Sequence, residues 1–141
     1  STRSIVKNKS LILIDDSLVR GTTCLKIVKM LYEAGAKEVH VRIACPEIKF
    51  PDFYGVDMPT KDELLAHKKS IKEMKEYIKA ESLKFLSIEG LYKALEKGER
   101  NNSYPQFSDH YFTGDYPIKP IDKLGELKVT QLSLLSGKSN N

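Results

Sequence analysis

An uninterrupted apolar run at residues 11–14 is followed directly by two aspartates, a short loop of small residues and an amphipathic segment. A continuous apolar run of this kind is typical of a strand that is buried on both faces of a parallel sheet. In such a sheet the carboxyl ends of the strands open into the crevice where ligands bind. The order of these features predicts an α/β fold with a ligand site directly after its first strand.

The two aspartates and the loop carry groups suited to a phosphorylated, hydroxyl-rich ligand. The carboxylates of Asp15 and Asp16 suit a vicinal diol or a hard cation such as magnesium. In residues 17–23 the small side chains allow backbone N–H groups to surround a phosphate, which the N-terminus of the next helix also attracts. Gly21 permits a positive φ or a close approach, and Arg20 either neutralises phosphate or points to solvent.

Three known families bind phosphate, or a metal ion through a pair of acidic residues, at a loop that follows a strand. The sequence departs from the pattern of each. A P-loop needs Gly-x-x-x-x-Gly-Lys before Ser or Thr, which does not occur, and a dinucleotide fingerprint needs three glycines where this loop has one. An apolar strand ending in Asp-Asp-Ser also resembles the receiver domains of response regulators. In that fold a phospho-accepting aspartate ends the third strand, whereas the predicted third strand here, residues 83–86, is followed by Ser87. The receiver domain stays an alternative.

Hydrophobic periodicity predicts the elements that surround the loop. A helix begins at Thr22 or Thr23, either of which can cap it through its hydroxyl, and ends at Gly35 in a left-handed cap. Residues 39–43 alternate between apolar and polar and form a second strand. Because a helix joins the two strands, we expect them to be parallel with a right-handed crossover.

The rest of the chain has a long loop and several short elements. The loop covers residues 45–59, and Thr60 and Glu63 then have the spacing of a capping box. Two short helices, the third strand at residues 83–86 and a helix that ends at Gly98 follow.

Three strands are few for a complete α/β sheet, and little in the chain could cover both edges of the first strand. We therefore expect the C-terminal part of a larger domain at residues 1–98. Residues 99–141 are rich in Asn, Ser and Pro, and we expect them to form an extended C-terminal tail.

Composition limits the partners. The chain has 141 residues, the length of one domain, and a net charge of +4 from 23 basic and 19 acidic residues. Its lysines are spread along predicted helices, so we expect no nucleic-acid partner. No apolar run approaches the ~20 residues needed to span a bilayer, so we expect no membrane partner. Cys24 and Cys45 form no metal or disulfide pattern, which favours buried thiols in a reducing cytoplasm.

Residues 12–23, Ile-Leu-Ile-Asp-Asp-Ser-Leu-Val-Arg-Gly-Thr-Thr, resemble the phosphoribosylpyrophosphate (PRPP) motif of type I phosphoribosyltransferases. The ending Ser-x-Val-Arg-Gly-Thr-Thr is similar to the version in the glutamine PRPP amidotransferase family. Further segments resemble the same family in the same order: residues 33–42, 46–51, 53–59, 63–67, 86–91 and 112–117.

The resemblance implies a Rossmann-like parallel sheet flanked by helices and a glycosyltransferase of de novo purine biosynthesis. In that reaction, ammonia from glutamine displaces pyrophosphate from PRPP and gives phosphoribosylamine and glutamate. By the family pattern, the two aspartates hold the ribose hydroxyls and take part in Mg²⁺ binding, and the loop surrounds the 5′-phosphate. The PRPP-binding residues implied are Asp15, Asp16, Ser17, Leu18, Val19, Arg20, Gly21, Thr22 and Thr23, with Asp15 and Asp16 also as metal ligands. The resemblance further implies purine nucleotide inhibitors, a homo-oligomer of the full-length enzyme and a cytoplasmic location.

Two departures from the family pattern limit these expectations. The glutaminase half and the first half of the phosphoribosyltransferase domain have no counterpart in the sequence, so we expect an inactive fragment and assign no catalytic residue. A non-catalytic remnant or a PRPP-binding module stays an alternative. One branch of the family carries an iron–sulfur cluster, with cysteines just before Phe-Thr-Gly-x-Tyr-Pro. Residues 104–111 contain no cysteine and Asp52 stands where that branch has another, so we expect no iron–sulfur cluster.

Overall fold

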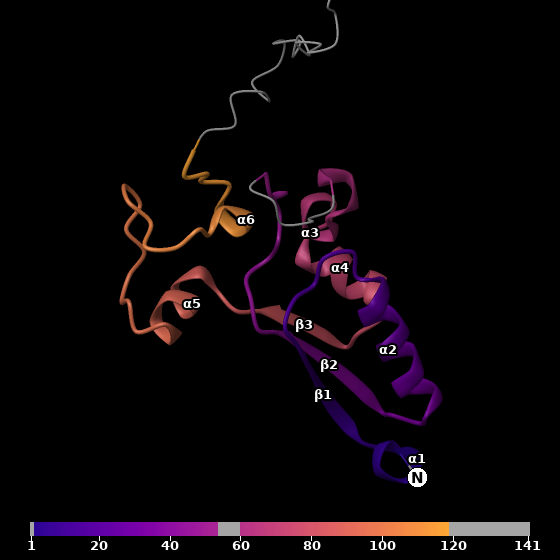
Figure 1. The fold of residues 1–141 in the computed structure, drawn as a ribbon. Coiled ribbons are helices and arrows are strands. Elements are labelled where there is room, and N and C mark those ends of the chain that lie inside the picture. Colours follow the sequence, from indigo (N-terminus) through magenta and orange to yellow (C-terminus); the bar gives the residue numbers. More distant parts are fainter. Residues whose placement is uncertain (1, 54–59, 119–141) are drawn as a thin grey trace, which may run out of the picture.

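The computed structural model describes residues 2–53 and 60–118 (Figure 1). Residues 54–59 of the predicted long loop and residues 119–141 of the predicted tail lie outside the described residues. The strands are β1 (Ser10–Asp15), β2 (Glu38–Ile43) and β3 (Ser82–Phe85). The helices are α1 (Thr2–Val6), α2 (Thr22–Glu33), the 3₁₀ turn η1 (Lys61–Glu63), α3 (Leu65–Lys68), α4 (Ile71–Ile78), α5 (Ile88–Ala94) and α6 (His110–Thr113).

The three strands form one parallel sheet in the order β1-β2-β3. Asp15 lies opposite Ile43, and Ile43 lies opposite Phe85, so the carboxyl ends of all three strands meet at one end of the sheet. This confirms the predicted α/β class with parallel strands. The loops that follow these ends, including the one after β1, therefore gather on the same side of the molecule.

The helices α2 and α4 lie along one face of the sheet, as Figure 1 shows, and α3 lies next to α4. Helix α4 contributes Met74 and Ile78, both with no exposed surface, and β2 contributes Val39 and Val41. Burying side chains of this size stabilises the fold by about 1.5–3 kcal/mol each. The core includes Leu18, Cys24, Val28, Val39, Val41, Ile43, Leu65, Ala66, Met74, Ile78, Ala80 and Leu83.

The prediction that the first strand is buried on both faces is wrong for the described structure. Ile12 is 66% exposed and Ile14 is 74% exposed, whereas Leu13 between them packs against the core. The reason is topological, because β1 is an edge strand and the described helices α2 and α4 cover the opposite face. An apolar pattern suited to two-sided burial thus occurs on a strand that is covered on one side.

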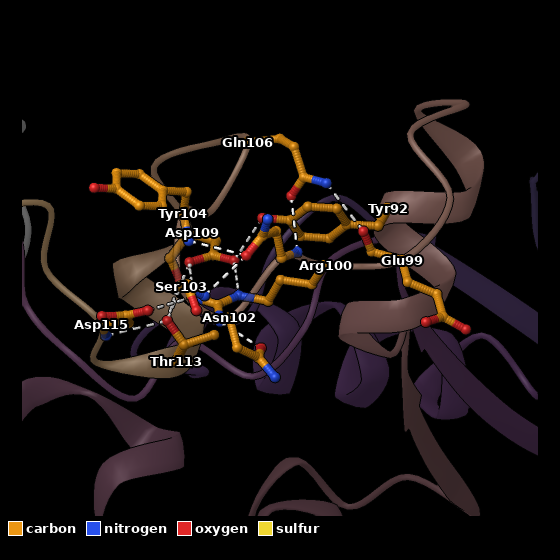
Figure 2. A network of polar contacts seen from close by, with 11 residues as sticks. Tyr92, Glu99, Arg100, Asn102, Ser103, Tyr104, Gln106, Asp109, Thr113 and Asp115 are labelled. Carbon is orange, nitrogen blue, oxygen red and sulfur yellow. Dashed lines mark hydrogen bonds and ion pairs between the residues drawn. The ribbon is translucent and has the colours of Figure 1, made fainter.

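The segment after residue 99 contains a buried polar network (Figure 2). The Nε of Arg100 donates to Asp109 at 2.5 Å and its Nη2 donates to the other carboxylate oxygen at 3.0 Å, while Tyr92 donates to Asp109 at 2.8 Å. Burial alone would raise the pKa of Asp109, but these hydrogen bonds and the Arg100 charge outweigh it and hold that pKa below its ordinary value. The network ties the end of α5 to the start of α6.

The same segment also packs on the loop that follows β2. His110 lies 2.8 Å from Asp52, with both side chains buried, and the Tyr116 hydroxyl donates to the Pro51 carbonyl at 2.9 Å. The segment is therefore held by specific contacts as far as Tyr116, although it contains little regular structure. The division of the chain at residue 98 stays a prediction.

Within residues 2–53 and 60–118, no helix combines the length and apolar character that crossing a bilayer requires.

Candidate functional site

A hollow of about 300 Å³ lies where β1 ends, and a single stretch of chain lines it. All nine residues predicted to bind the ligand, at positions 15–23, are brought together there. Cys24 also lines the hollow and was not predicted there, because it was expected only as a buried thiol, and it is indeed 2% exposed. Its place in the first turn of α2 is the signal that could have identified it.

The N-terminal cap of α2 differs from the prediction. Gly21 occupies the N-cap position with φ +75°, and the helix has no side-chain cap. The expectation that Thr22 or Thr23 caps the helix is therefore wrong, because both lie inside the first turn. Without a capping oxygen, the N–H groups of that turn can donate to an anion, and the helix dipole favours negative charge at the same place.

Gly21 is also required by packing. A Cβ atom built on Gly21 would lie 2.6 Å from Leu65 Cδ2 and 3.1 Å from Tyr77 Cε1. Both distances are shorter than ordinary contacts between carbon atoms. Leu65 of α3 and Tyr77 of α4 thus lie directly against the backbone of the loop.

Several contacts fix the loop from behind. The Leu18 side chain is 2% exposed and belongs to the core. The backbone N–H of Leu65 donates to the Val19 carbonyl at 2.9 Å. The guanidinium of Arg20 lies 3.1 Å from Glu63. Arg20 was expected either to neutralise phosphate or to point to solvent, and neither expectation includes this ion pair. Leu65 and Glu63 were not predicted as part of the site because they follow their partners Gly21 and Arg20 by more than 40 residues.

The two aspartates keep most of their acceptor capacity for a ligand. The backbone N–H of Asp16 donates to Asp15 Oδ1 at 3.1 Å, and the Ser17 hydroxyl donates to Asp16 Oδ1 at 3.1 Å. Each carboxylate has further lone pairs. In the described part of the chain, no three His, Cys, Asp or Glu side chains converge as a metal site. Two carboxylates fit a cation that keeps waters and ligand phosphates in its coordination sphere, as Mg²⁺ does.

Two thiols lie close to the aspartates. Burial, together with the nearby charge of Asp15, raises the pKa of Cys24 to about 11. Burial, together with the nearby charge of Asp16, raises the pKa of Cys45 to about 11. At neutral pH both groups are therefore uncharged thiols, which are poor nucleophiles. They form neutral neighbours of the acidic pair.

The parallel sheet flanked by helices matches the phosphoribosyltransferase type of α/β fold. The acidic pair, the glycine-turned loop and the uncapped helix N-terminus lie together at the carboxyl end of this sheet. Over most of its length, the chain is homologous to a segment of the amidophosphoribosyltransferase family. It is 54% identical over 137 residues to the amidophosphoribosyltransferase of Rhizobium etli, and the alignment covers 96% of this chain and 28% of the relative. The Staphylococcus aureus enzyme is 49% identical over 122 residues, covering 86% of this chain and 24% of the relative.

Solved structures agree with this assignment. The B. subtilis glutamine PRPP amidotransferase, complexed with ADP and GMP, is similar with a TM-score of 0.74 and 45% identity, over 83% of this chain and 26% of that one. A structure described as the allosteric regulatory enzyme of purine biosynthesis is similar with a TM-score of 0.72 and 45% identity, over 82% and 24%. No family model matches the chain. The chain spans about a quarter of the length of the relatives it matches.

Proposed function

We propose that this chain is the part of an amidophosphoribosyltransferase of de novo purine biosynthesis that binds the ribose 5-phosphate portion of PRPP. The observation that carries the proposal is the hollow after β1, where the acidic pair and the uncapped start of α2 converge. The identity of 54% to the Rhizobium etli relative supports the same reaction, in which ammonia from glutamine replaces pyrophosphate.

The roles of the residues follow from the chemistry of the substrate. The first-turn N–H groups of α2 and the hydroxyls of Thr22 and Thr23 bind the 5′-phosphate, whose negative charge the helix dipole stabilises. Asp15 and Asp16 accept hydrogen bonds from the ribose hydroxyls. The 5′-phosphate takes no part in the chemistry, so its binding energy can be used to position the sugar while charge develops at the anomeric carbon.

Magnesium fits the donor set of the acidic pair. Asp15 and Asp16 would hold it together with oxygens of PRPP. When bound, it offsets negative charge on the departing pyrophosphate. We propose no iron–sulfur cluster.

The remaining ligands and partners are proposed for a full-length enzyme like the relatives, of which this chain matches about a quarter. Among the described residues only positions 15–24 line the hollow, so groups that bind pyrophosphate and deliver ammonia would come from elsewhere in the longer enzyme. We therefore propose that the fragment binds its ligand and is inactive alone. Purine nucleotide inhibitors, a homo-oligomer and a cytoplasmic location are proposed for the full-length enzyme; the B. subtilis neighbour holds ADP and GMP.

Calorimetric titration with PRPP tests the site. Asp16→Asn is expected to weaken binding about tenfold or more, because it removes a charged acceptor. Glu33→Gln is the control, since it removes a carboxylate at the far end of α2. Equal affinity of the wild type, Asp16→Asn and Glu33→Gln for PRPP would refute the site. If the full-length protein bound PRPP but had no amidotransferase activity, the alternative of a PRPP-binding module would be favoured.

A further inference from the structure

The η1–α3 turn, residues 61–68, contacts the loop of residues 17–23, which we call the phosphate loop. The Leu65 N–H donates to the Val19 carbonyl at 2.9 Å, and the Leu65 side chain lies against Gly21. The Nε and Nη2 atoms of Arg20 lie 3.2 and 3.1 Å from Glu63 Oε1. The hollow itself is lined by residues 15–24, and no residue of the turn is among them.

The turn also has contacts of its own. A capping box joins Thr60 and Glu63, with the Thr60 N–H donating to Glu63 Oε2 at 3.3 Å. The next three residues, positions 64–66, are 0%, 7% and 6% exposed. Because these residues are anchored in the interior, the turn can act as a rigid support for the loop.

The hydrogen bond at Val19 determines the direction of the following N–H group. In a trans peptide the C=O of one residue and the N–H of the next point in opposite directions. The described residues contain no cis peptide bond. Since the Val19 carbonyl points to Leu65, the Arg20 N–H points away from α3, and Arg20 is one of the residues that line the hollow.

We infer that Leu65 and Glu63 are positioning residues for phosphate binding. The Leu65 N–H orients the peptide between Val19 and Arg20 so that the Arg20 N–H donates to the 5′-phosphate. Glu63 restrains the Arg20 side chain and has a smaller effect, because the two side chains are 55% and 46% exposed. The inference rests on the proposed function, since it requires a phosphate in the hollow.

Leu65→Pro tests the N–H group, with Leu65→Ala as its matched control. Leu65 is the first residue of α3, where proline is tolerated, and Leu64 has φ −75° and ψ 114°, which suits a residue before proline. Both variants lose the side chain, but the proline variant also loses the donor. In the full chain, we expect ribose 5-phosphate to bind about tenfold more weakly to Leu65→Pro than to Leu65→Ala.

Amide NMR supplies a readout that a purely structural role would not change. Ribose 5-phosphate should shift the Arg20 amide in the wild type and in Leu65→Ala. In Leu65→Pro that shift should disappear, while the Thr22 and Thr23 amides still respond. Equal affinities of the two variants, with the Arg20 shift retained, would overturn the inference.

Glu63→Gln keeps the inference testable if the proline variant does not fold. It should weaken binding about two- to fivefold in the wild type and have no further effect in an Arg20→Gln background, as a double-mutant cycle would show. The same loss in both backgrounds would contradict a role through Arg20. If the folded wild type binds no ribose 5-phosphate, the proposed function fails and this inference fails with it. If the wild type binds and the variants do not differ, the inference alone fails.

Discussion

Replacing Gly21 with alanine perturbs the contact between the phosphate loop and the two helices behind it. The structure gives two separate costs. At φ +75° an alanine adopts the left-handed conformation, which costs about 1–2 kcal/mol. Its Cβ would also lie 2.6 Å from Leu65, and overpacking of this kind costs about 1–3 kcal/mol. We therefore expect Gly21→Ala to lower the free energy of unfolding by about 2–5 kcal/mol.

Gly98 provides the matched control for this prediction. It has φ +68°, close to that of Gly21, but a Cβ there would meet no atom within 4 Å. Gly98→Ala should therefore cost only the conformational part, about 1–2 kcal/mol. Urea denaturation followed by circular dichroism measures both free energies of unfolding. Equal losses in the two variants would refute the close packing of Leu65 and Tyr77 on the loop.

Three further predictions concern the acid stability, the thiols and the metal. Asp109→Asn should destabilise the protein at neutral pH. The wild type should lose the stabilisation from ionised Asp109 on acidification. The folded state holds the pKa of Asp109 below its ordinary value of 3.8, so this stabilisation is complete above that value and is lost as the pH falls through the lowered pKa. Denaturation at pH 7 and pH 3 measures this, and a pH-independent difference would contradict it. Cys24 and Cys45 should react with a thiol reagent far more slowly at pH 7.5 than in urea, since burial raises both pKa values to about 11; similar rates would contradict it. Mg²⁺ should strengthen PRPP binding in the wild type, and calorimetry with a chelator should show a smaller effect of the metal in Asp16→Asn.

Local patterns predicted much of the fold. The apolar run before Asp15 and the alternation around Val41 predicted two neighbouring strands, and the structure pairs them in parallel. The capping box of Thr60 and Glu63 is present as expected. These features depend on residues a few positions apart, so the sequence displays them directly.

Features that depend on distant segments could not be predicted in this way. The exposure of Ile12 and Ile14 depends on which elements cover the sheet, and no local pattern contains that information. The bond from Leu65 to Val19 joins positions 46 residues apart. Arg100 and Asp109 lie in a segment without periodicity, so their pairing could not be inferred.

The residues of the candidate site were predicted more completely than the geometry in which they are held. All of positions 15–23 line one hollow because they are continuous in sequence and follow one strand. The start of α2 was placed correctly, but its cap was not. Threonine is a common capping residue, whereas here Gly21 is the N-cap and leaves the first-turn donors without a side-chain acceptor.

The most direct test of the central claim compares ribose 5-phosphate with ribose by calorimetric titration of the folded chain. If the hollow after β1 binds the 5′-phosphate through the start of α2, ribose 5-phosphate should bind at least about a hundredfold more tightly, because several charge-assisted hydrogen bonds are lost without the phosphate. Equal affinities for the two sugars, or no binding of either, would contradict the account.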